Sequence, residues 1–162
     1  DSYNTVINNI DDEQCVMGGG KKTGWKFHMM GLRDVDILMN WIDACLPHAA
    51  MHVGGGESTN DYGASIINDK AMRISESWGI HYNKGEYVTK HNHFPFAMSF
   101  NYCVSAPKDC SPFILEGDEI EPVPGRIIFF HAHKNHWTKP NESNGRCMIV
   151  GNIVYDPELL KP

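Results

Sequence analysis

Residues 71–82, AMRISESWGIHY, alternate apolar side chains with polar or small ones. The same period of two returns in residues 98–104, MSFNYCV, and two further β-rich runs cover residues 126–130 and 147–155. Successive side chains of a strand point to opposite faces, so this period predicts β-strands. Turn signals rich in Gly, Asn, Asp and Pro separate the runs. The pattern predicts a mainly β protein, a double-stranded β-helix (jelly roll) of about eight core strands.

One helix is predicted before the strands. Residues 34–46 place apolar side chains on a single stripe at helical spacing, with Asp34 as a candidate cap and Pro47 after the end. We expect this helix to pack on the jelly roll. We expect residues 1–32 to be irregular, with one strand near residues 25–30. The residues that follow the helix are rich in Gly, Asn, Ser and Thr, which predicts a loop.

The composition predicts one compact domain over residues 1–162, with a helical and irregular part over about residues 1–70 and the jelly-roll core over about residues 71–155. Net charge is −6 and no basic run occurs, so neither nucleic acid nor membrane is expected as a partner. The five cysteines form no CxxC pair, which favours reduced thiols and a cytoplasmic location. The sequence is compatible with a homodimer.

The chain contains nine histidines, and most of them lie in its second half. His91 and His93 are two apart, and on extended chain both imidazoles point to the same side and can reach one metal ion. A third ligand has to come from later in the chain, where His131, His133 and His136 are the candidates. Three ligands on one face of an octahedral iron leave positions open for a chelating cosubstrate and dioxygen.

Three segments around these histidines resemble a known family. Residues 82–93, YNKGEYVTKHNH, resemble the approach to the first metal motif of prolyl-hydroxylase-like oxygenases, which use Fe(II) and 2-oxoglutarate. Residues 120–130, IEPVPGRIIFF, resemble the strand before their distal histidine, and residues 136–140, HWTKP, resemble their His-x-x-x-Pro. Arg146 follows at the usual spacing. The resemblance extends over about residues 71–155, roughly half of the chain.

The resemblance implies an Fe(II)- and 2-oxoglutarate-dependent dioxygenase, an oxidoreductase that hydroxylates a C–H bond of a peptide side chain or a small molecule. It implies Fe(II) as cofactor, with 2-oxoglutarate, dioxygen and an unidentified primary substrate as partners. His91, His93 and His136 are the expected metal ligands. No side chain is assigned as a catalytic acid, base or nucleophile.

Three residues are expected to bind the cosubstrate. Arg146 carries a planar, always charged fork suited to the far carboxylate of 2-oxoglutarate. Tyr82 stands where such enzymes often place a cosubstrate-binding tyrosine. Tyr102 is the weaker candidate, because it shares the strand parity of Phe100 and Val104, which favours packing.

Two positions depart from the family pattern. His93 replaces the usual Asp or Glu of the metal motif, and Met148 replaces a frequent Ser after the arginine. A similar phage- and bacteria-associated subgroup also carries His-x-His, so the first departure is compatible with a metal site. The alternatives are a cupin-like three-histidine dioxygenase that does not use 2-oxoglutarate, and a non-catalytic metal-binding jelly roll.

Overall fold

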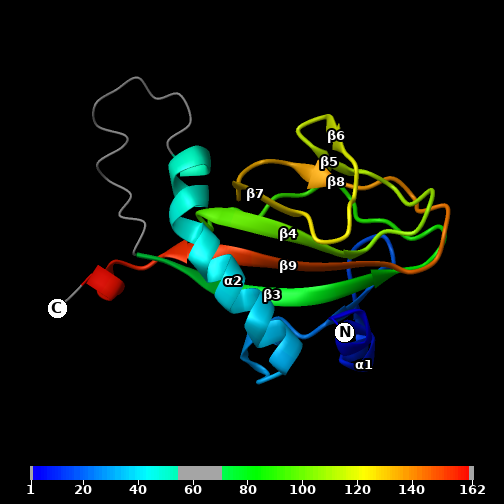
Figure 1. Cartoon of the computed structure of the whole chain (residues 1–162). Coiled ribbons are helices and arrows are strands. Elements are labelled where there is room, and N and C mark those ends of the chain that lie inside the picture. The colour runs from blue at the N-terminus through cyan, green and yellow to red at the C-terminus, as the bar shows by residue number, and fades with distance from the viewer. Residues whose placement is uncertain (1, 55–70, 161–162) are drawn as a thin grey trace.

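The computed structural model describes residues 2–54 and 71–160 (Figure 1). Its helical elements are α1 (Ser2–Asn8), η1 (Phe27–Met29), α2 (Arg33–Ala49), η2 (Ala50–Gly54) and η4 (Pro157–Leu160). Its strands are β1 (Ile10–Cys15), β2 (Lys21–Thr23), β3 (Met72–Tyr82), β4 (Met98–Ser105), β5 (Phe113–Leu115), β6 (Asp118–Ile120), β7 (Ile127–His131), β8 (His136–Trp137) and β9 (Arg146–Tyr155). Most of the loop predicted after the helix lies outside the described residues.

The strands form two antiparallel sheets. The larger has the order β1-β2-β3-β9-β4-β7, and the smaller has the order β6-β5-β8. The long central strands β3 and β9 pair from Met72↔Tyr155 to Tyr82↔Arg146, and β9 pairs on its other side with β4. Sequence neighbours are thus often not sheet neighbours, as in a jelly roll. The predicted mainly β, jelly-roll fold is confirmed.

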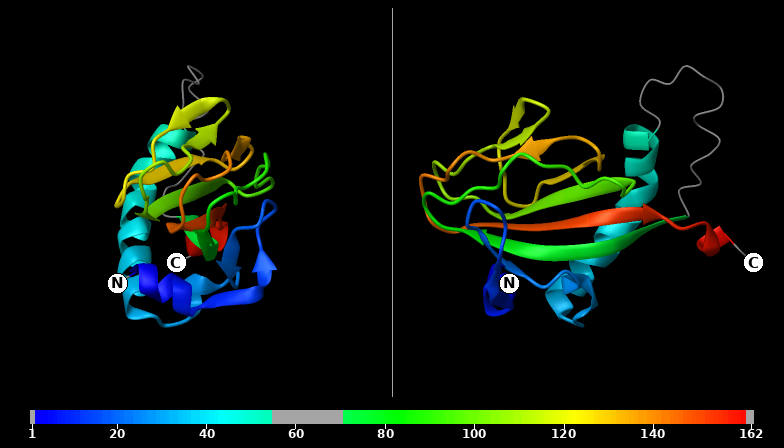
Figure 2. Two further views of the ribbon diagram at one scale, coloured as in Figure 1. Left: turned by 90° about the vertical axis from the view of Figure 1, so that its right-hand side faces the viewer. Right: turned by 180° about the vertical axis from the view of Figure 1, so that it is seen from behind.

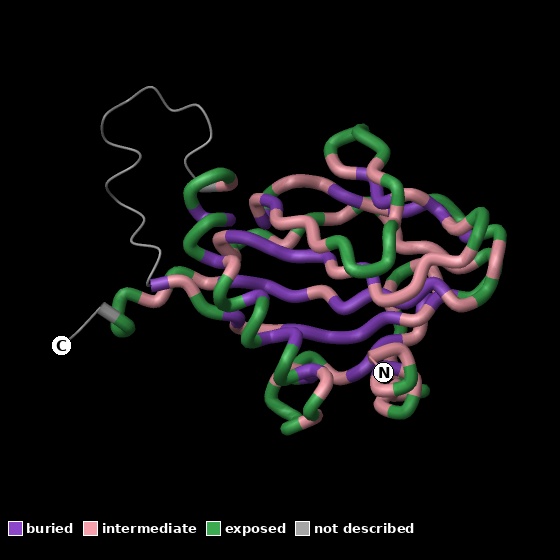
Figure 3. The backbone as a smooth tube through the Cα atoms, viewed as in Figure 1, coloured by how far each residue is buried: buried purple, intermediate pink, exposed green. Residues whose placement is uncertain are grey.

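Helix α2 lies across one face of the larger sheet, and the loops that lead to β4 and from β8 lie on the other side (Figure 2). Its apolar stripe packs against β3, β4 and β9 in the main core. Buried segments of the backbone run along these three strands, whereas the outer side of α2 is exposed and the loops are exposed or half-buried (Figure 3). None of the helices in the described ranges is long and apolar enough to cross a bilayer.

A bulge in β3 divides the apolar residues of the predicted strand between two cores. The register of β3 against β9 shifts between Ile74 and Glu76. Ile74, before the shift, packs in the core under α2. Trp78 and Tyr82, after it, pack on the interior side of the sheet with Met148. An extra residue in one strand reverses which face its later side chains occupy, so the bulge aims Trp78 and Tyr82 into the jelly roll.

The N-terminal part is more ordered than the sequence predicts. Residues 2–32 are not mainly irregular, because α1, β1 and β2 lie there, and the strand predicted near residues 25–30 is the 3-10 turn η1. Strand β2 extends the larger sheet by pairing with β3, and the Thr23 hydroxyl accepts a hydrogen bond of 3.0 Å from the Gly79 N–H. These contacts are between distant parts of the chain, and a local pattern of alternation does not reveal them.

The predicted helix is confirmed, but both of its ends differ from the prediction. Helix α2 begins at Arg33, and the residue before it is Leu32, which makes no side-chain cap. Asp34 therefore lies in the first turn, where its charge favours the helix dipole, and is not the cap. Pro47 lies inside the last turns, which continue to Ala49. Proline costs this helix one backbone hydrogen bond near its end, and the chain continues through it.

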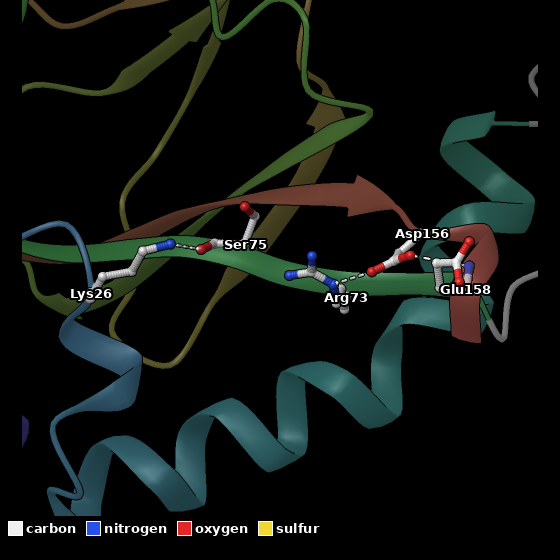
Figure 4. Close-up of polar contacts among 5 residues, drawn as sticks. All are labelled: Lys26, Arg73, Ser75, Asp156 and Glu158. Atoms are coloured by element: carbon white, nitrogen blue, oxygen red, sulfur yellow. Dashed lines mark hydrogen bonds and ion pairs between the residues drawn. The ribbon is translucent and has the colours of Figure 1, made fainter.

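Two polar contacts attach the flanking segments to the exposed part of β3 (Figure 4). Lys26 Nζ donates to the Ser75 carbonyl at 2.6 Å, and Arg73 Nε lies 2.8 Å from Asp156 Oδ2. The other Asp156 oxygen accepts the Glu158 N–H at 3.1 Å. Strand β3 thus holds both the segment that follows β2 and the segment that follows β9.

Candidate metal centre

Backbone pairing places His91 opposite His136. An isolated antiparallel bridge joins the two residues, with the His91 N–H donating to the His136 carbonyl at 3.1 Å and the reverse bond at 2.9 Å. The His93 N–H donates to the Ala132 carbonyl at 2.7 Å. These bonds join the loop after β3 to the segment around β8, so histidines more than forty positions apart become neighbours.

The side chains of His91, His93 and His136 converge on one point. Their candidate ligand atoms all lie within 4.8 Å of one another, and the Nε2 atoms of His91 and His93 are 3.1 Å apart. Three imidazole nitrogens grouped on one side of a point are a donor set that fits iron and related divalent ions.

Each of the three rings is oriented through its other nitrogen. The Nδ1 atoms lie 2.8 Å from the Thr89 carbonyl for His91, 2.5 Å from Asn152 Oδ1 for His93, and 3.1 Å from the Lys134 carbonyl for His136. A ring nitrogen that faces an oxygen carries the proton, so each Nε2 is left with a lone pair directed at the common point. Metal-binding histidines are usually held in this way.

Burial favours the neutral state that metal binding needs. It lowers the pKa of His136 to about 3 and that of His93 to about 4. Neighbouring histidines add to the lowering, since two protonated rings this close repel each other. The rings of His93 and His136 are therefore neutral donors at physiological pH.

His131 and His133, the alternative third ligands, face each other elsewhere. Their ring centroids are 5.0 Å apart, and neither residue belongs to the group formed by His91, His93 and His136. His131 is the last residue of β7, and His133 lies in the turn between β7 and β8, before His136 forms the bridge with His91. The geometry favours His136 as the third ligand.

His93 has the most elaborate support of the three. Asn152 Oδ1, which accepts from its ring, also accepts the Ser99 hydroxyl at 3.0 Å. The Asn152 amide nitrogen donates to Glu76 Oε2 at 3.1 Å. The Trp78 ring stacks on the His93 ring, with an angle of 8° between the planes. The Glu76 carboxylate is thus linked to the His93 ring through the Asn152 side chain.

Arg146 is held in an enclosed cavity next to the histidines. It is the largest fully buried side chain described, with 1% of its surface exposed. One guanidinium nitrogen donates to the Ser111 carbonyl at 2.6 Å, and the group lies 5.6 Å from the centre of the Tyr82 ring. Its Nε atom has no partner, and among the described residues no carboxylate forms an ion pair with it. A buried positive charge without a counterion is costly, so this cavity fits an anion.

The two predicted tyrosines lie on opposite faces of the larger sheet. Tyr82 lines the cavity with Arg146 and the three histidines, and burial raises its pKa to about 12, so that its hydroxyl stays protonated. Tyr102 packs in the core under α2, with its ring edge-to-face with Trp41 at 6.2 Å. The structure therefore places Tyr82 with the site and places Tyr102 away from it. This position of Tyr102 agrees with the packing role that its place on the strand predicts.

Two further residues of the cavity are missed by the sequence analysis as site residues. Asn101 Oδ1 and Trp78 Nε1 are buried without partners, and both residues line the cavity around Arg146. Asn101 lies on β4 between apolar residues. If only one face of the strand were buried, this alternation would predict that Asn101 faces solvent. In a jelly roll this second face of the strand is the interior. A polar residue on the second face, here Asn101, is therefore the sequence signal for a site residue.

A second, more open cleft adjoins the same histidines. It has a volume of about 460 Å³ and is lined by His91 and His93, by residues 15–17 with Lys22 and Trp25 from the N-terminal segment, and by Phe94 and Phe96 from the loop before β4. Trp78 lines both spaces. The candidate metal centre thus has an enclosed cavity on one side and an open cleft on the other.

Comparison with known proteins supports the fold assignment. No family model and no curated protein matches the sequence. Among solved structures, a viral collagen prolyl hydroxylase from Paramecium bursaria Chlorella virus-1 aligns with a TM-score of 0.66 at 15% identity, covering 94% of this chain and 86% of that one. A prolyl-4-hydroxylase from Pseudomonas putida gives 0.65 at 13% identity, covering 91% and 78%. A prolyl hydroxylase from Trichoplax adhaerens, solved with a hypoxia-inducible-factor peptide, gives 0.62 at 14% identity, covering 98% and 80%.

At these identities the likeness concerns the fold. The chain has the jelly-roll architecture of the prolyl hydroxylases, as its sequence resemblance predicts. It also carries a cluster of three histidines whose donor set suits iron.

Proposed function

We propose that this protein is an Fe(II)- and 2-oxoglutarate-dependent oxygenase. His91, His93 and His136 would hold the iron through their Nε2 atoms. Arg146 would bind the far carboxylate of 2-oxoglutarate, with Tyr82 and Asn101 as further polar groups in the same cavity.

The observation that carries the proposal is the unpaired guanidinium of Arg146 in the cavity that also contains the three histidines. A cosubstrate that ligates the metal at one end and carries a carboxylate at the other would join the two. 2-Oxoglutarate has this form, since its keto acid end chelates iron and its second carboxylate is free. A fork of guanidinium donors suits such a carboxylate.

Iron held by the three histidines would, with the chelated keto acid, supply the activation of dioxygen that gives succinate, carbon dioxide and a hydroxylated substrate. The chain's own residues have supporting roles. The Thr89 and Lys134 carbonyls and the Asn152 side chain orient the ligand rings. Trp78, which stacks on His93, and the apolar cavity wall exclude water from the centre.

The third histidine favours one alternative. His93 occupies the place of a carboxylate, so the metal would be surrounded by three neutral donors, as in a cupin-type three-histidine dioxygenase that does not use 2-oxoglutarate. In that case Arg146 would bind a carboxylate of the substrate itself. The carboxylate of Glu76, linked to His93 through Asn152, partly offsets the lost charge and keeps the first proposal ahead.

Anaerobic titration of the Fe(II)-loaded protein with 2-oxoglutarate tests the proposal. We expect a visible metal-to-ligand charge-transfer band at sub-millimolar cosubstrate and, after admission of air, succinate in step with oxygen uptake. Zinc-loaded protein, which cannot activate oxygen, is the control. No band at about 10 mM 2-oxoglutarate, where even a weak Kd near 1 mM would give near-saturation, would reject the proposal. Substrate-dependent oxygen uptake without succinate would then favour the three-histidine alternative.

A further inference from the structure

A second buried cation lies beside the candidate metal centre, in the open cleft. Lys22 lies on β2, only 5% of its surface is exposed, and it lines the same cleft as His91 and His93. Lysine is rarely buried to this extent unless its charge is paired. Its position therefore needs an explanation.

The contacts of the Lys22 ammonium hold it in place without neutralising it. Nζ donates to Gln14 Oε1 at 2.6 Å and lies 3.4 Å from the Thr23 carbonyl. It also sits 3.7 Å from the centre of the Trp25 ring. All three partners are uncharged, and no carboxylate in the described part of the chain forms an ion pair with Lys22. Burial lowers its pKa, against the opposing fields of Asp11, Cys15 and Glu76.

The remaining lining of the cleft contains one carboxylate, that of Glu76, which accepts the Asn152 amide at 3.1 Å, and is otherwise largely apolar. Trp78 forms its floor beside His93, and exposed apolar side chains stand at its rim, including Met17 at 69% and Phe94 at 77% exposure. Large exposed apolar residues grouped around a cleft are typical of ligand-binding sites. A ligand that fits this cleft has an apolar body and a single anionic group.

We propose that Lys22 is the recognition site for a carboxylate of the primary substrate, whose apolar body lies across Trp78 toward His91 and His93. The name primary substrate rests on the proposed function, but the binding site itself does not require iron or 2-oxoglutarate. Arg146 and Lys22 would then take one carboxylate each, Arg146 from the cosubstrate in the enclosed cavity and Lys22 from the substrate in the open cleft.

Isothermal titration of the metal-free protein with matched ligands tests this site. The acids are 3-phenylpropionate and hexanoate, and the controls are their uncharged amides. We expect each acid to bind at least about 10-fold more tightly than its amide, because the amide leaves the ammonium without a counterion. The capped dipeptide N-acetyl-phenylalanyl-glutamate amide tests whether the bound carboxylate belongs to a peptide or to a small acid. Tighter binding than the free acids indicates a carboxylate on a peptide, and weaker binding indicates a small acid.

Substitutions locate the binding. Lys22→Met keeps an apolar stem of similar length and should weaken binding of the acids at least about 10-fold, with no effect on the amides. Lys21→Met is the matched control, because Lys21 is the adjacent residue of β2 and its ammonium donates to the Asp12 carbonyl instead. Lys22→Arg should restore most of the affinity. A purely structural lysine would instead show as a lower melting temperature of Lys22→Met with the difference between acid and amide unchanged.

Three further results would overturn the inference. They are equal binding of acids and amides to the wild type, no acid binding at about 20 mM, and loss of acid binding in Arg146→Met but not in Lys22→Met. The last result would place the acids in the enclosed cavity. Because these titrations use metal-free protein, they are independent of the charge-transfer band that tests the iron and 2-oxoglutarate proposal.

Discussion

The enclosed cavity around Arg146 and the open cleft around Lys22 share the wall formed by Trp78, His91 and His93, but different parts of the chain build the rest. Strands β3, β4 and β9 line much of the enclosed cavity. The cleft takes one side from the N-terminal segment around β1 and β2. Under the proposed function, the jelly roll would hold the metal and the cosubstrate, whereas the N-terminal segment would shape the space for a substrate.

Each space contains a buried cation that no carboxylate in the described residues neutralises. The chain as a whole carries an excess of acidic residues, with a net charge of −6. Unpaired cations in such a chain are therefore not explained by a shortage of partners. They support the two proposed anion sites, which lie on either side of the wall formed by Trp78, His91 and His93.

The largest expected effect concerns the third histidine of the cluster, which lines the enclosed cavity. His136→Ala should abolish iron binding, because one of only three protein donors is removed. His133→Ala is the matched control and should keep its iron, since His133 faces His131 and lies outside the cluster. Iron content after gel filtration, measured against protein concentration, checks both. Full iron in His136→Ala together with loss in His133→Ala would show that the third ligand is wrongly assigned.

A smaller effect is expected behind His93, in the wall between cavity and cleft. Asn152→Ala should weaken metal binding by about 10- to 100-fold, because it frees the His93 ring and breaks the link to Glu76. Asn152→Asp keeps an acceptor for the ring and should bind metal at least as tightly as the wild type. Competition for Co(II) against a chelating dye measures the three affinities. Equal affinity of the alanine variant would mean that His93 needs no orienting partner.

The smallest effect is expected on stability. Arg146→Met and Lys22→Met each remove a buried charge that lacks a counterion, so the free energy of unfolding should stay within about 1 kcal/mol of the wild type or rise. Phe100→Ala, which empties part of the core under α2, should cost about 3–5 kcal/mol. Urea unfolding of the ligand-free proteins gives the comparison. A loss of that size in either methionine variant would make its cation a structural element of the fold.

The sequence predicts the jelly roll and its helix because both follow from local periodicity. The alternation in residues 71–82 and 98–104 and the stripe in residues 34–46 are each strong enough to override weak propensities. The N-terminal strands have no such pattern. Strand β2 has only three residues and owes its place to pairing with β3, a contact that no local rule identifies.

The candidate site divides in the same way. His91, His93, His136, Arg146 and Tyr82 are predicted from spacing and resemblance, and the structure brings them to one cavity. Lys22, Asn101 and Asn152 are not predicted, because their roles depend on which face of a strand is interior. The bulge in β3 and the pairing of β2 with β3 determine which side chains face the interior. Both depend on contacts between distant parts of the chain.

The most direct test of the enclosed cavity is the affinity of Arg146→Met for 2-oxoglutarate, with Arg126→Met as a control because Arg126 is exposed and donates to the Glu121 carbonyl. The charge-transfer band of the anaerobic Fe(II) proteins reports binding. We predict a Kd raised at least about 100-fold in Arg146→Met, from the cost of about 3–5 kcal/mol for breaking a buried ion pair, and an unchanged Kd in Arg126→Met. Equal 2-oxoglutarate affinity in Arg146→Met and the wild type would contradict the assignment of this cavity to the cosubstrate.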